Sequence, residues 1–210
     1  PLLPDDFNFR SHRDNSHLGD FTLTAIQGPH TQDIRKQFST ADLLYSMGTE
    51  HPGAITLHNF PRALQNFVKH IDGEAIRIDL AALDVMRDRE RGVPRYNDFR
   101  ELLRMPRIKR FEDLTNRPEW VATLRDVYDN DIDRVDTQVG MLAEPLPKGF
   151  GFSETAFRIF VLMAGRRITS DRFFTDDYRP AVYTKLGIDW VEDNDMASVL
   201  LRHFPELTPR

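Results

Sequence analysis

The sequence contains no cysteine, which excludes disulfide bonds, thiol nucleophiles and thiolate-ligated metals but does not identify the cellular compartment. It also has no apolar run near the roughly 20 residues that cross a bilayer, and no charged-then-apolar signal peptide. We therefore expect a soluble chain without a transmembrane segment and leave its localisation unknown. Because the chain does not start with Met, we expect it to be processed or excised.

Long blocks of one charge sign are missing as well. The 28 basic and 33 acidic residues are mixed along the chain and give a net charge of -5, which argues against a nucleic-acid partner. No Walker loop, dinucleotide fingerprint or Gly-x-Ser-x-Gly elbow occurs. The spacing of Asp129, Asp131 and Asp133 matches the first ligand positions of a calcium-binding loop. Because Arg134 and Gly140 stand where that loop requires Gly and Glu, we expect no calcium there.

Apolar residues are plentiful enough for a core. They make up 40% of the 210 residues, so the sequence predicts a single piece, either one domain or a large part of one. Residues 1–38 are polar and lack a sustained period, which predicts extended or looping structure. From Pro61 onward, two amphipathic helices are predicted by apolar residues at helical spacing: Leu64, Phe67, Val68 and Ile71, and then Ile78, Ala81, Ala82 and Val85.

Local signals predict where the later helices begin and end. Gly92-Val93-Pro94 should end the second amphipathic helix, because Gly adopts a left-handed C-terminal conformation and Pro cannot continue the hydrogen-bond ladder. Four more helices are predicted at about 96–105, 117–128, 154–167 and 195–203. For the second of these, Asn116 and Glu119 have capping-box spacing, and Val121, Leu124 and Val127 should form the apolar face.

One block carries a family resemblance. Leu80 to Arg100, LAALDVMRDRERGVPRYNDFR, resembles the catalytic-domain signature of the animal-type haem peroxidases, and most closely that of the fatty-acid α-dioxygenases. The opening Pro1-Leu2-Leu3-Pro4-Asp5 resembles the segment that follows the haem-ligating proximal histidine in this superfamily, which includes the cyclooxygenases. The resemblance implies a mainly α fold, the C-terminal part of the all-helical haem peroxidase-like fold. Residues 1–60 would form a loop-rich wrap and residues 61–210 a helical core.

Within this block, Asp84 matches the residue that lies behind the proximal histidine in the family. The resemblance implies that its carboxylate accepts a hydrogen bond from the imidazole N–H, which would orient the ring and raise its basicity. An anionic acceptor would also favour the higher oxidation states of the iron. By spacing alone, Asp84 could instead pair with a neighbour such as Arg87 on a solvated helix face, with an effect of only a few tenths of a kcal/mol.

The segment Gly151 to Arg167, GFSETAFRIFVLMAGRR, resembles the stretch that lines the fatty-acid channel of α-dioxygenases. By this correspondence Arg167 is the carboxylate clamp, Phe160 a wall residue and Arg166 a further substrate-binding candidate. Phe160 and Arg167 are two helical turns apart and share a face, whereas Arg166 points elsewhere. An apolar wall and a bidentate cation suit a fatty acid. Alternatively, both arginines only interact with the dipole at a helix C-terminus.

The resemblance implies a haem-dependent fatty-acid α-dioxygenase. In that reaction, peroxide-oxidised haem generates a tyrosyl radical, the radical abstracts hydrogen from the α-carbon, and O2 adds to give a 2-hydroperoxy acid. The radical tyrosine, the proximal histidine and the distal histidine are all expected upstream of this chain, so no catalytic residue or metal ligand is assigned within it. We expect the chain alone to be inactive and to work with the N-terminal half of the same polypeptide, which would ligate the haem.

Two alternatives remain at this point. A general haem peroxidase or a cyclooxygenase-like fatty-acid oxygenase shares much of the signature, and analysis of its products would distinguish it. A truncated, haem-free helical binding module would show no Soret band after haem reconstitution.

One stretch of the sequence is rich in basic residues: Arg100, Arg104, Arg107, Lys109 and Arg110. These cations predict either a solvated face or a peripheral contact with anionic lipid, at ~1 kcal/mol for each cation near the surface.

Overall fold

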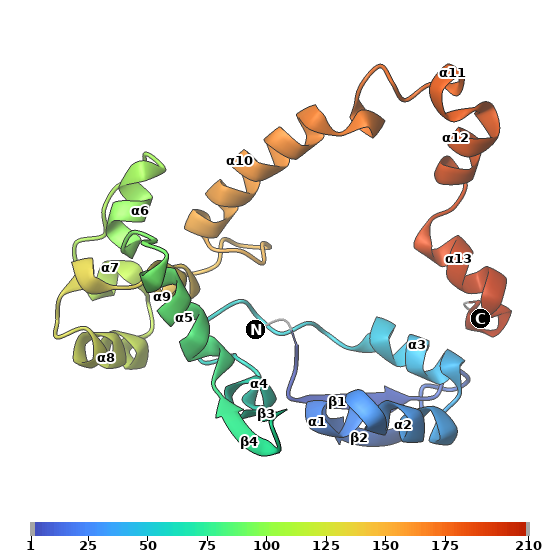
Figure 1. Ribbon diagram of the computed structural model, residues 1–210, viewed down its shortest axis with the longest axis horizontal. Coiled ribbons are helices and arrows are strands. Elements are labelled where there is room, and N and C mark those ends of the chain that lie inside the picture. Colours follow the sequence, from blue (N-terminus) through green and yellow to red (C-terminus); the bar gives the residue numbers. More distant parts are fainter. Residues whose placement is uncertain (1–2, 209–210) are drawn as a thin grey trace. The chain divides into compact units, whose positions relative to one another are not determined.

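Figure 1 shows the computed structural model, which describes residues 3–208. The described chain is mainly helical, which confirms the predicted fold class. Its two sheets are both two-stranded antiparallel hairpins. Contacts between residues divide the chain into two compact units, one built on Pro52–Leu162 and the other on Asp5–His51 together with the residues from Met163 onward. Pro1 and Leu2, the first residues of the opening motif, lie outside the described residues.

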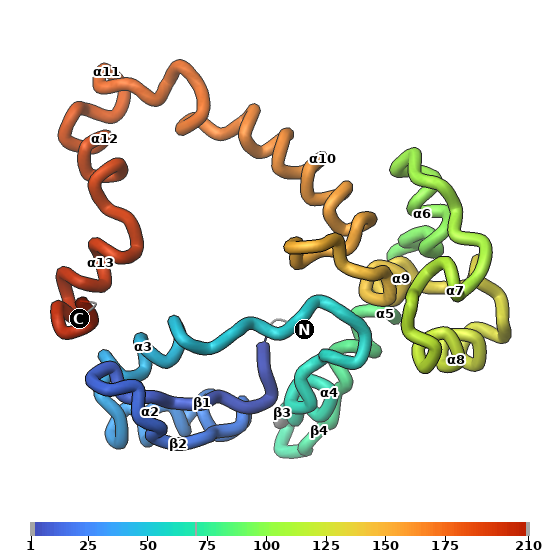
Figure 2. The backbone as a smooth tube through the Cα atoms, turned by 180° about the vertical axis from the view of Figure 1, so that it is seen from behind, coloured from blue at the N-terminus to red at the C-terminus, as the bar shows by residue number. Residues whose placement is uncertain are grey.

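The unit built on Pro52–Leu162 contains a hairpin followed by a group of helices (Figure 2). Its elements are α4 (Arg62–Gln65), β3 (Phe67–Ile71), β4 (Glu74–Ile78), α5 (Leu80–Glu90), α6 (Tyr96–Leu102), α7 (Phe111–Leu114), α8 (Pro118–Val127), the 3-10 turn η2 (Ile132–Arg134) and α9 (Thr137–Ala143). The long helix α10 (Glu154–Ser170) begins in this unit and continues into the other.

The second unit combines an N-terminal hairpin with helices from both ends of the chain. Its first part contains β1 (Asp6–Arg10), β2 (His17–Thr22), α1 (Leu23–Ile26), η1 (Gly28–His30), α2 (Thr31–Gln37) and α3 (Thr40–Thr49). Its second part contains η3 (Arg172–Phe174), α11 (Pro180–Tyr183), α12 (Lys185–Glu192), α13 (Met196–His203) and η4 (Pro205–Leu207).

The core of the first unit lies where α6, α7, α8 and α9 meet. It consists of buried apolar side chains from all four helices and the intervening loops: Tyr96, Phe111, Leu114, Val121, Leu124, Tyr128, Val135 and Ala143. Within α8, the predicted face is right for Val121 and Leu124 but wrong for Val127, which is 63% exposed. Tyr128 takes its place, because position 128 lies two turns beyond Val121 on the same side of the helix.

The first predicted amphipathic helix is wrong. The chain forms only the short α4 and then the β3–β4 hairpin, whose strands pair Phe67 with Ile78 and Ile71 with Glu74. Asp72 and Gly73 connect the strands with φ values of 52° and 84°. An Asp-Gly pair with two positive φ angles forms the turn that matches the twist of a hairpin, and β-branched residues favour strands. These two signals outweigh the helical spacing.

Several other local predictions can be compared with the structure. Helices α1 and α2 and the 3-10 turn η1 lie inside residues 1–38, which were predicted to be extended or looping, and α3 lies inside the loop-rich wrap expected over residues 1–60. Helix α8 begins at Pro118, one residue after the predicted start, and Arg117 is its N-cap without a side-chain hydrogen bond, so the predicted capping box of Asn116 is wrong. The restarted helix α6 is confirmed but ends at Leu102 instead of Met105.

Candidate functional site

The helix α5 carries the signature block and has well-defined ends. The Asp79 carboxylate caps its start by accepting hydrogen bonds from the amides of Ala81 at 2.9 Å and Ala82 at 3.0 Å. At the other end, Gly92 adopts φ 72°, and the amide of Val93 donates to the carbonyl of Asp88 at 2.9 Å. This bond pattern ends a helix in a fixed direction. The predicted stop at Gly92-Val93-Pro94 is confirmed.

Beyond this stop, the buried Asp136 ties α5 to the core. Arg89 donates two hydrogen bonds to its carboxylate, from Nε at 2.9 Å and from Nη2 at 2.6 Å. Arg95 also donates to Asp136, and the Tyr128 hydroxyl donates at 3.0 Å. Burial acts to raise the pKa of Asp136, but the hydrogen bonds from Arg89 and Tyr128 outweigh it and hold the pKa below its ordinary value. Asp136 is therefore ionised, and it fixes the C-terminal end of α5.

Asp84, the predicted partner of the proximal histidine, lies in the middle of α5. Its side chain is exposed and forms no hydrogen bond or ion pair with any residue of the described range 3–208. Five residues separate it from Arg89, which places the two side chains about 140° apart around the helix. Since Arg89 faces the core through Asp136, Asp84 faces away from it. The alternative pairing of Asp84 with Arg87 does not form.

A second buried carboxylate, Glu144, lies at the other end of α9. It accepts a hydrogen bond from the Tyr96 hydroxyl at 2.6 Å, and the Arg100 guanidinium lies 3.3 Å from the same oxygen. Its remaining oxygen accepts from the Thr155 amide at 3.1 Å, and the Thr155 hydroxyl also bonds to Glu144. Arg100 reaches the Thr155 hydroxyl at 2.7 Å. This network fastens the first turn of α10 to α6 and α9.

From that attachment, α10 continues as a helix with exposed apolar side chains. Phe160, the predicted wall residue, is 55% exposed. Its ring stacks on Phe157 at 6.2 Å and on Phe152 at 6.1 Å between centroids, and Phe150 packs on Phe157 at 4.5 Å. Other apolar residues of α10 that are 44–51% exposed are Val161, Leu162, Met163 and Ile168. A helix that is apolar on most sides is normally covered by protein or by a ligand.

The two predicted arginines follow on the same helix. Arg167 is seven residues after Phe160, so both side chains leave α10 on one face, and Arg166 is turned about 100° away from Arg167. Both arginines are exposed, and neither guanidinium pairs with a carboxylate within residues 3–208. The helix extends to Ser170, so Arg167 lies in its last turn and Arg166 just before that turn.

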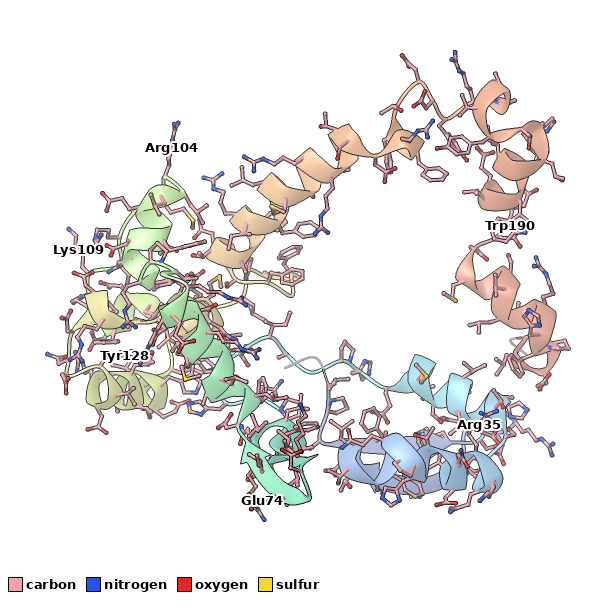
Figure 3. All side chains as sticks on the ribbon, viewed as in Figure 1. Arg35, Glu74, Arg104, Lys109, Tyr128 and Trp190 are labelled. Carbon is pink, nitrogen blue, oxygen red and sulfur yellow. The ribbon has the colours of Figure 1, made fainter. Side chains whose placement is uncertain are left out.

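The basic run is less cationic than its sequence indicates. Arg100 is buried against Glu144, Arg107 pairs with Asp98, Glu101 and Asp133, and Arg110 pairs with Asp113. Arg104 and Lys109 point away from the fold in Figure 3. The carboxylates beside Arg107 and Arg110 offset most of the charge that would attract anionic lipid. In residues 3–208 no helix is long and apolar enough to cross a bilayer.

Sequence reasoning missed Asp136, Glu144 and Thr155. The two carboxylates have partners far away in the sequence, with Arg89 47 residues before Asp136 and Tyr96 48 residues before Glu144. One local signal was available, because a Glu at a helix C-terminus opposes the helix dipole and needs compensating partners when it is buried. Within the described part of the chain, no group of three or more His, Asp or Glu side chains is arranged to hold a metal ion.

Known proteins resemble this chain over nearly its whole length. The family described as animal haem peroxidase matches residues 1–210. Alpha-dioxygenase 2 of Arabidopsis thaliana is 46% identical over 190 residues, which cover 89% of this chain and 30% of that protein. A crystal structure of the fatty acid alpha-dioxygenase of Oryza sativa matches with a TM-score of 0.88 at 39% identity, covering 99% of this chain and 36% of that one. A further structure of the rice enzyme, with palmitic acid, has a TM-score of 0.87 and 40% identity over the same shares of 99% and 36%.

These relatives are longer than the chain, which spans about a third of their length. The similarity confirms the resemblance that the block Leu80–Arg100 indicated, and the match to the rice structure confirms the peroxidase-like helical fold. The chain belongs to the animal haem peroxidase family and is similar to the α-dioxygenases among its members.

Proposed function

We propose that this chain is the C-terminal part of a haem-dependent fatty-acid α-dioxygenase. It would place Asp84 behind the iron-ligating histidine and would present Phe160 and Arg167 to the fatty acid. The net reaction breaks one Cα–H bond and forms a Cα–O and an O–H bond, so that O2 enters the substrate whole and no further reductant is consumed.

The observation that carries this proposal is the surface of α10. Its exposed phenylalanines offer an apolar wall, and Arg167 stands about 10 Å further along the same face, at 1.5 Å of rise per residue. A free guanidinium beyond an apolar stripe matches an amphipathic ligand with one carboxylate end. The relative of known structure with palmitic acid agrees with this ligand class.

Asp84 fits the role expected for it beside haem. Its carboxylate lies on a helix fixed at both ends, on the face opposite the core, with no partner among residues 3–208. An acceptor of this kind can take the N–H of an imidazole that another segment supplies, and can hold the tautomer whose other nitrogen binds iron. When bound, haem supplies the oxidising equivalents, drawn from peroxide, that peroxidase chemistry requires.

Arg167→Ala in the complete haem-loaded protein tests the substrate assignment. Loss of a charge-assisted, bidentate contact should raise the KM for palmitate about 10- to 100-fold. Arg158→Ala is the matched control, since Arg158 is an exposed arginine half a turn away around α10, about 180° from Arg167. It should change the KM by less than about twofold.

Equal effects of Arg167→Ala and Arg158→Ala would contradict a carboxylate clamp at Arg167. Arg166→Ala should have an intermediate effect at most, because its side chain leaves the helix in another direction. In that case Arg166 would contribute only general positive charge near the fatty acid carboxylate.

A further inference from the structure

The helix α9 has a buried carboxylate at each end, and the two carboxylates bind different parts of the proposed active site. Asp136, at its N-cap, is 5% exposed, and Glu144, at its C-cap, is 6% exposed. Asp136 accepts from Arg89 of α5. Glu144 accepts from Thr155 of α10. Seven helical residues thus separate the attachment of the Asp84 helix from that of the Phe160 helix.

We propose that α9 is a positioning strut, in which Asp136 sets the orientation of Asp84 toward the haem ligand and Glu144 sets the direction of α10 toward the substrate. This inference rests on the function proposed above. Neither carboxylate would touch haem or fatty acid. Each would act through the helix that it holds.

At the Asp136 end, the clamp acts on a short, stiff helix. Asp84 precedes Arg89 by five residues, about 7.5 Å along α5. The two parallel hydrogen bonds from Arg89 fix the rotation of the helix as well as its position. A histidine hydrogen bond needs its acceptor within roughly 0.5 Å and 10–20° of the productive geometry. Without the clamp, α5 would be held by the cap at Asp79, by its packing on α4 and by the chain turn at Gly92, none of which fixes its C-terminal half to the core.

At the Glu144 end, the attachment sets the direction in which α10 leaves the core. Thr155 is the second residue of α10, and both its amide and its hydroxyl bind Glu144. Phe160, in the same compact unit, lies five residues further, about 7.5 Å along the helix axis. A tilt of about 10° at Thr155 would therefore move Phe160 sideways by about 1.3 Å. A displacement of that size changes the fit of a bound fatty acid.

The two ends of α9 both bind residues of α6 or its N-cap, but each end binds different side chains. They have α6 in common, through Arg95 at Asp136 and through Tyr96 and Arg100 at Glu144. Both phenols remain protonated donors, because burial and then the adjacent carboxylate raise the pKa of Tyr128 to about 12 and that of Tyr96 well above its ordinary value. Among the described residues, the Arg89 side chain donates hydrogen bonds to Asp136 alone, whereas the Thr155 hydroxyl bonds to Glu144 and Arg100 and lies beside the Tyr96 hydroxyl. Each side chain can therefore be changed without breaking the other attachment.

The test uses Arg89→Gln and Thr155→Val in the complete haem-loaded protein, with two readouts. Arg89→Gln should lower the iron–histidine stretching frequency of the ferrous haem and change the KM for palmitate by less than about twofold. Thr155→Val keeps the shape of the side chain but loses the hydroxyl bonds, and should raise the KM about tenfold while leaving the stretching frequency unchanged.

Matched controls separate these effects from general destabilisation. Arg91→Gln removes an exposed arginine next to the same helix end and should leave both readouts unchanged, and Thr155→Ser restores the hydroxyl and should return the KM to within about twofold of the parent protein. If Arg89→Gln does not fold, Arg89→Lys keeps the charge, loses the bidentate geometry and should shift the frequency in the same direction by less.

The strut is refuted if each variant changes both readouts together, if neither variant changes its own readout, or if Arg91→Gln matches Arg89→Gln. Failure of the proposed function gives a different result. A parent protein that binds no haem, or that binds haem and does not oxidise palmitate, overturns the α-dioxygenase assignment and the strut with it. If the parent protein oxidises palmitate but the two variants do not change different readouts, only the strut is overturned.

Discussion

Gly140→Ala should destabilise the protein, although adding one methyl group to a helix normally stabilises it. Gly140 lies inside α9, where its Cα faces the ring of Tyr96. A Cβ at this position would lie 2.2 Å from Cδ2 and 2.3 Å from Cγ of that ring. Ordinary contacts between carbons are about 3.5–4.0 Å, so the ring or the helix would have to move by more than about 1 Å.

Neither partner can move easily. Tyr96 is fully buried, and its hydroxyl is held by Glu144 at 2.6 Å. The atoms that clash are near the base of the ring, which cannot swing away without breaking that bond. Overpacking of this kind costs about 1–3 kcal/mol, whereas replacing Gly by Ala within a helix gains up to about 1 kcal/mol. Because contacts of 2.2 and 2.3 Å place the cost at the upper end of that range, we expect a net loss of about 2 kcal/mol in the free energy of unfolding.

Urea unfolding of the complete protein measures this loss as a lower midpoint at an unchanged slope. Gly48→Ala is the control, because Gly48 is also helical, in α3, and no atom lies within 4 Å of its built Cβ. It should be neutral or stabilising by up to about 1 kcal/mol. If Gly140→Ala also stabilises the protein, the close packing of α9 on Tyr96 is wrong, and the strut loses its structural basis.

Two further predictions concern stability. The pKa of Asp42 is about 2: burial raises it, but hydrogen bonds from Ser39 and His12 outweigh burial and lower it from 3.8. A carboxylate with a lowered folded-state pKa stabilises above pH 3.8 and loses this contribution, about 2 kcal/mol, as the pH falls to about 2. Asp42→Asn should therefore make the free energy of unfolding less dependent on pH between these values. Asp33→Asn, at an exposed site, should leave that dependence unchanged, and identical curves for the two variants would contradict the role of Asp42. Gly73→Ala should cost about 1 kcal/mol by thermal unfolding, because φ is 84° in the hairpin turn and nothing crowds the site; a stabilised variant would contradict that turn.

Helices with strong local signals were predictable from the sequence. Helix α5 ends at the predicted stop Gly92-Val93-Pro94, α10 begins at Glu154 directly after Ser153, and α13 follows Asp195. The Asp195 carboxylate caps α13 by accepting from the Ser198 amide at 2.7 Å. In each case the signal lies within a few residues of the boundary, and the local preference agrees with the final packing. Helix α12 was missed, although its cap, Thr184, accepts from the Gly187 amide.

The hairpin β3–β4 and the two buried carboxylates were not predicted, for different reasons. The apolar residues between Leu64 and Ile71 fit a helical period as well as a strand, and only the Asp72-Gly73 turn decides between them. The roles of Asp136 and Glu144 depend on partners 41 to 48 residues away. Such contacts form when the helices pack, so the one local signal, a Glu at a helix C-terminus, does not identify the partners.

The measurement that tests the central claim most directly is the product formed from palmitic acid by the complete haem-loaded protein, in oxygenated buffer with a trace of peroxide. Mass spectrometry should identify the 2-hydroperoxy acid, or the aldehyde shortened by one carbon that derives from it, in step with oxygen uptake. Oxygen inserted elsewhere along the chain would favour a cyclooxygenase-like oxygenase, and oxidation of a peroxidase dye without fatty-acid product would favour a general peroxidase. Either of these results, or a haem-loaded protein that consumes no oxygen with fatty acids, would contradict the α-dioxygenase assignment.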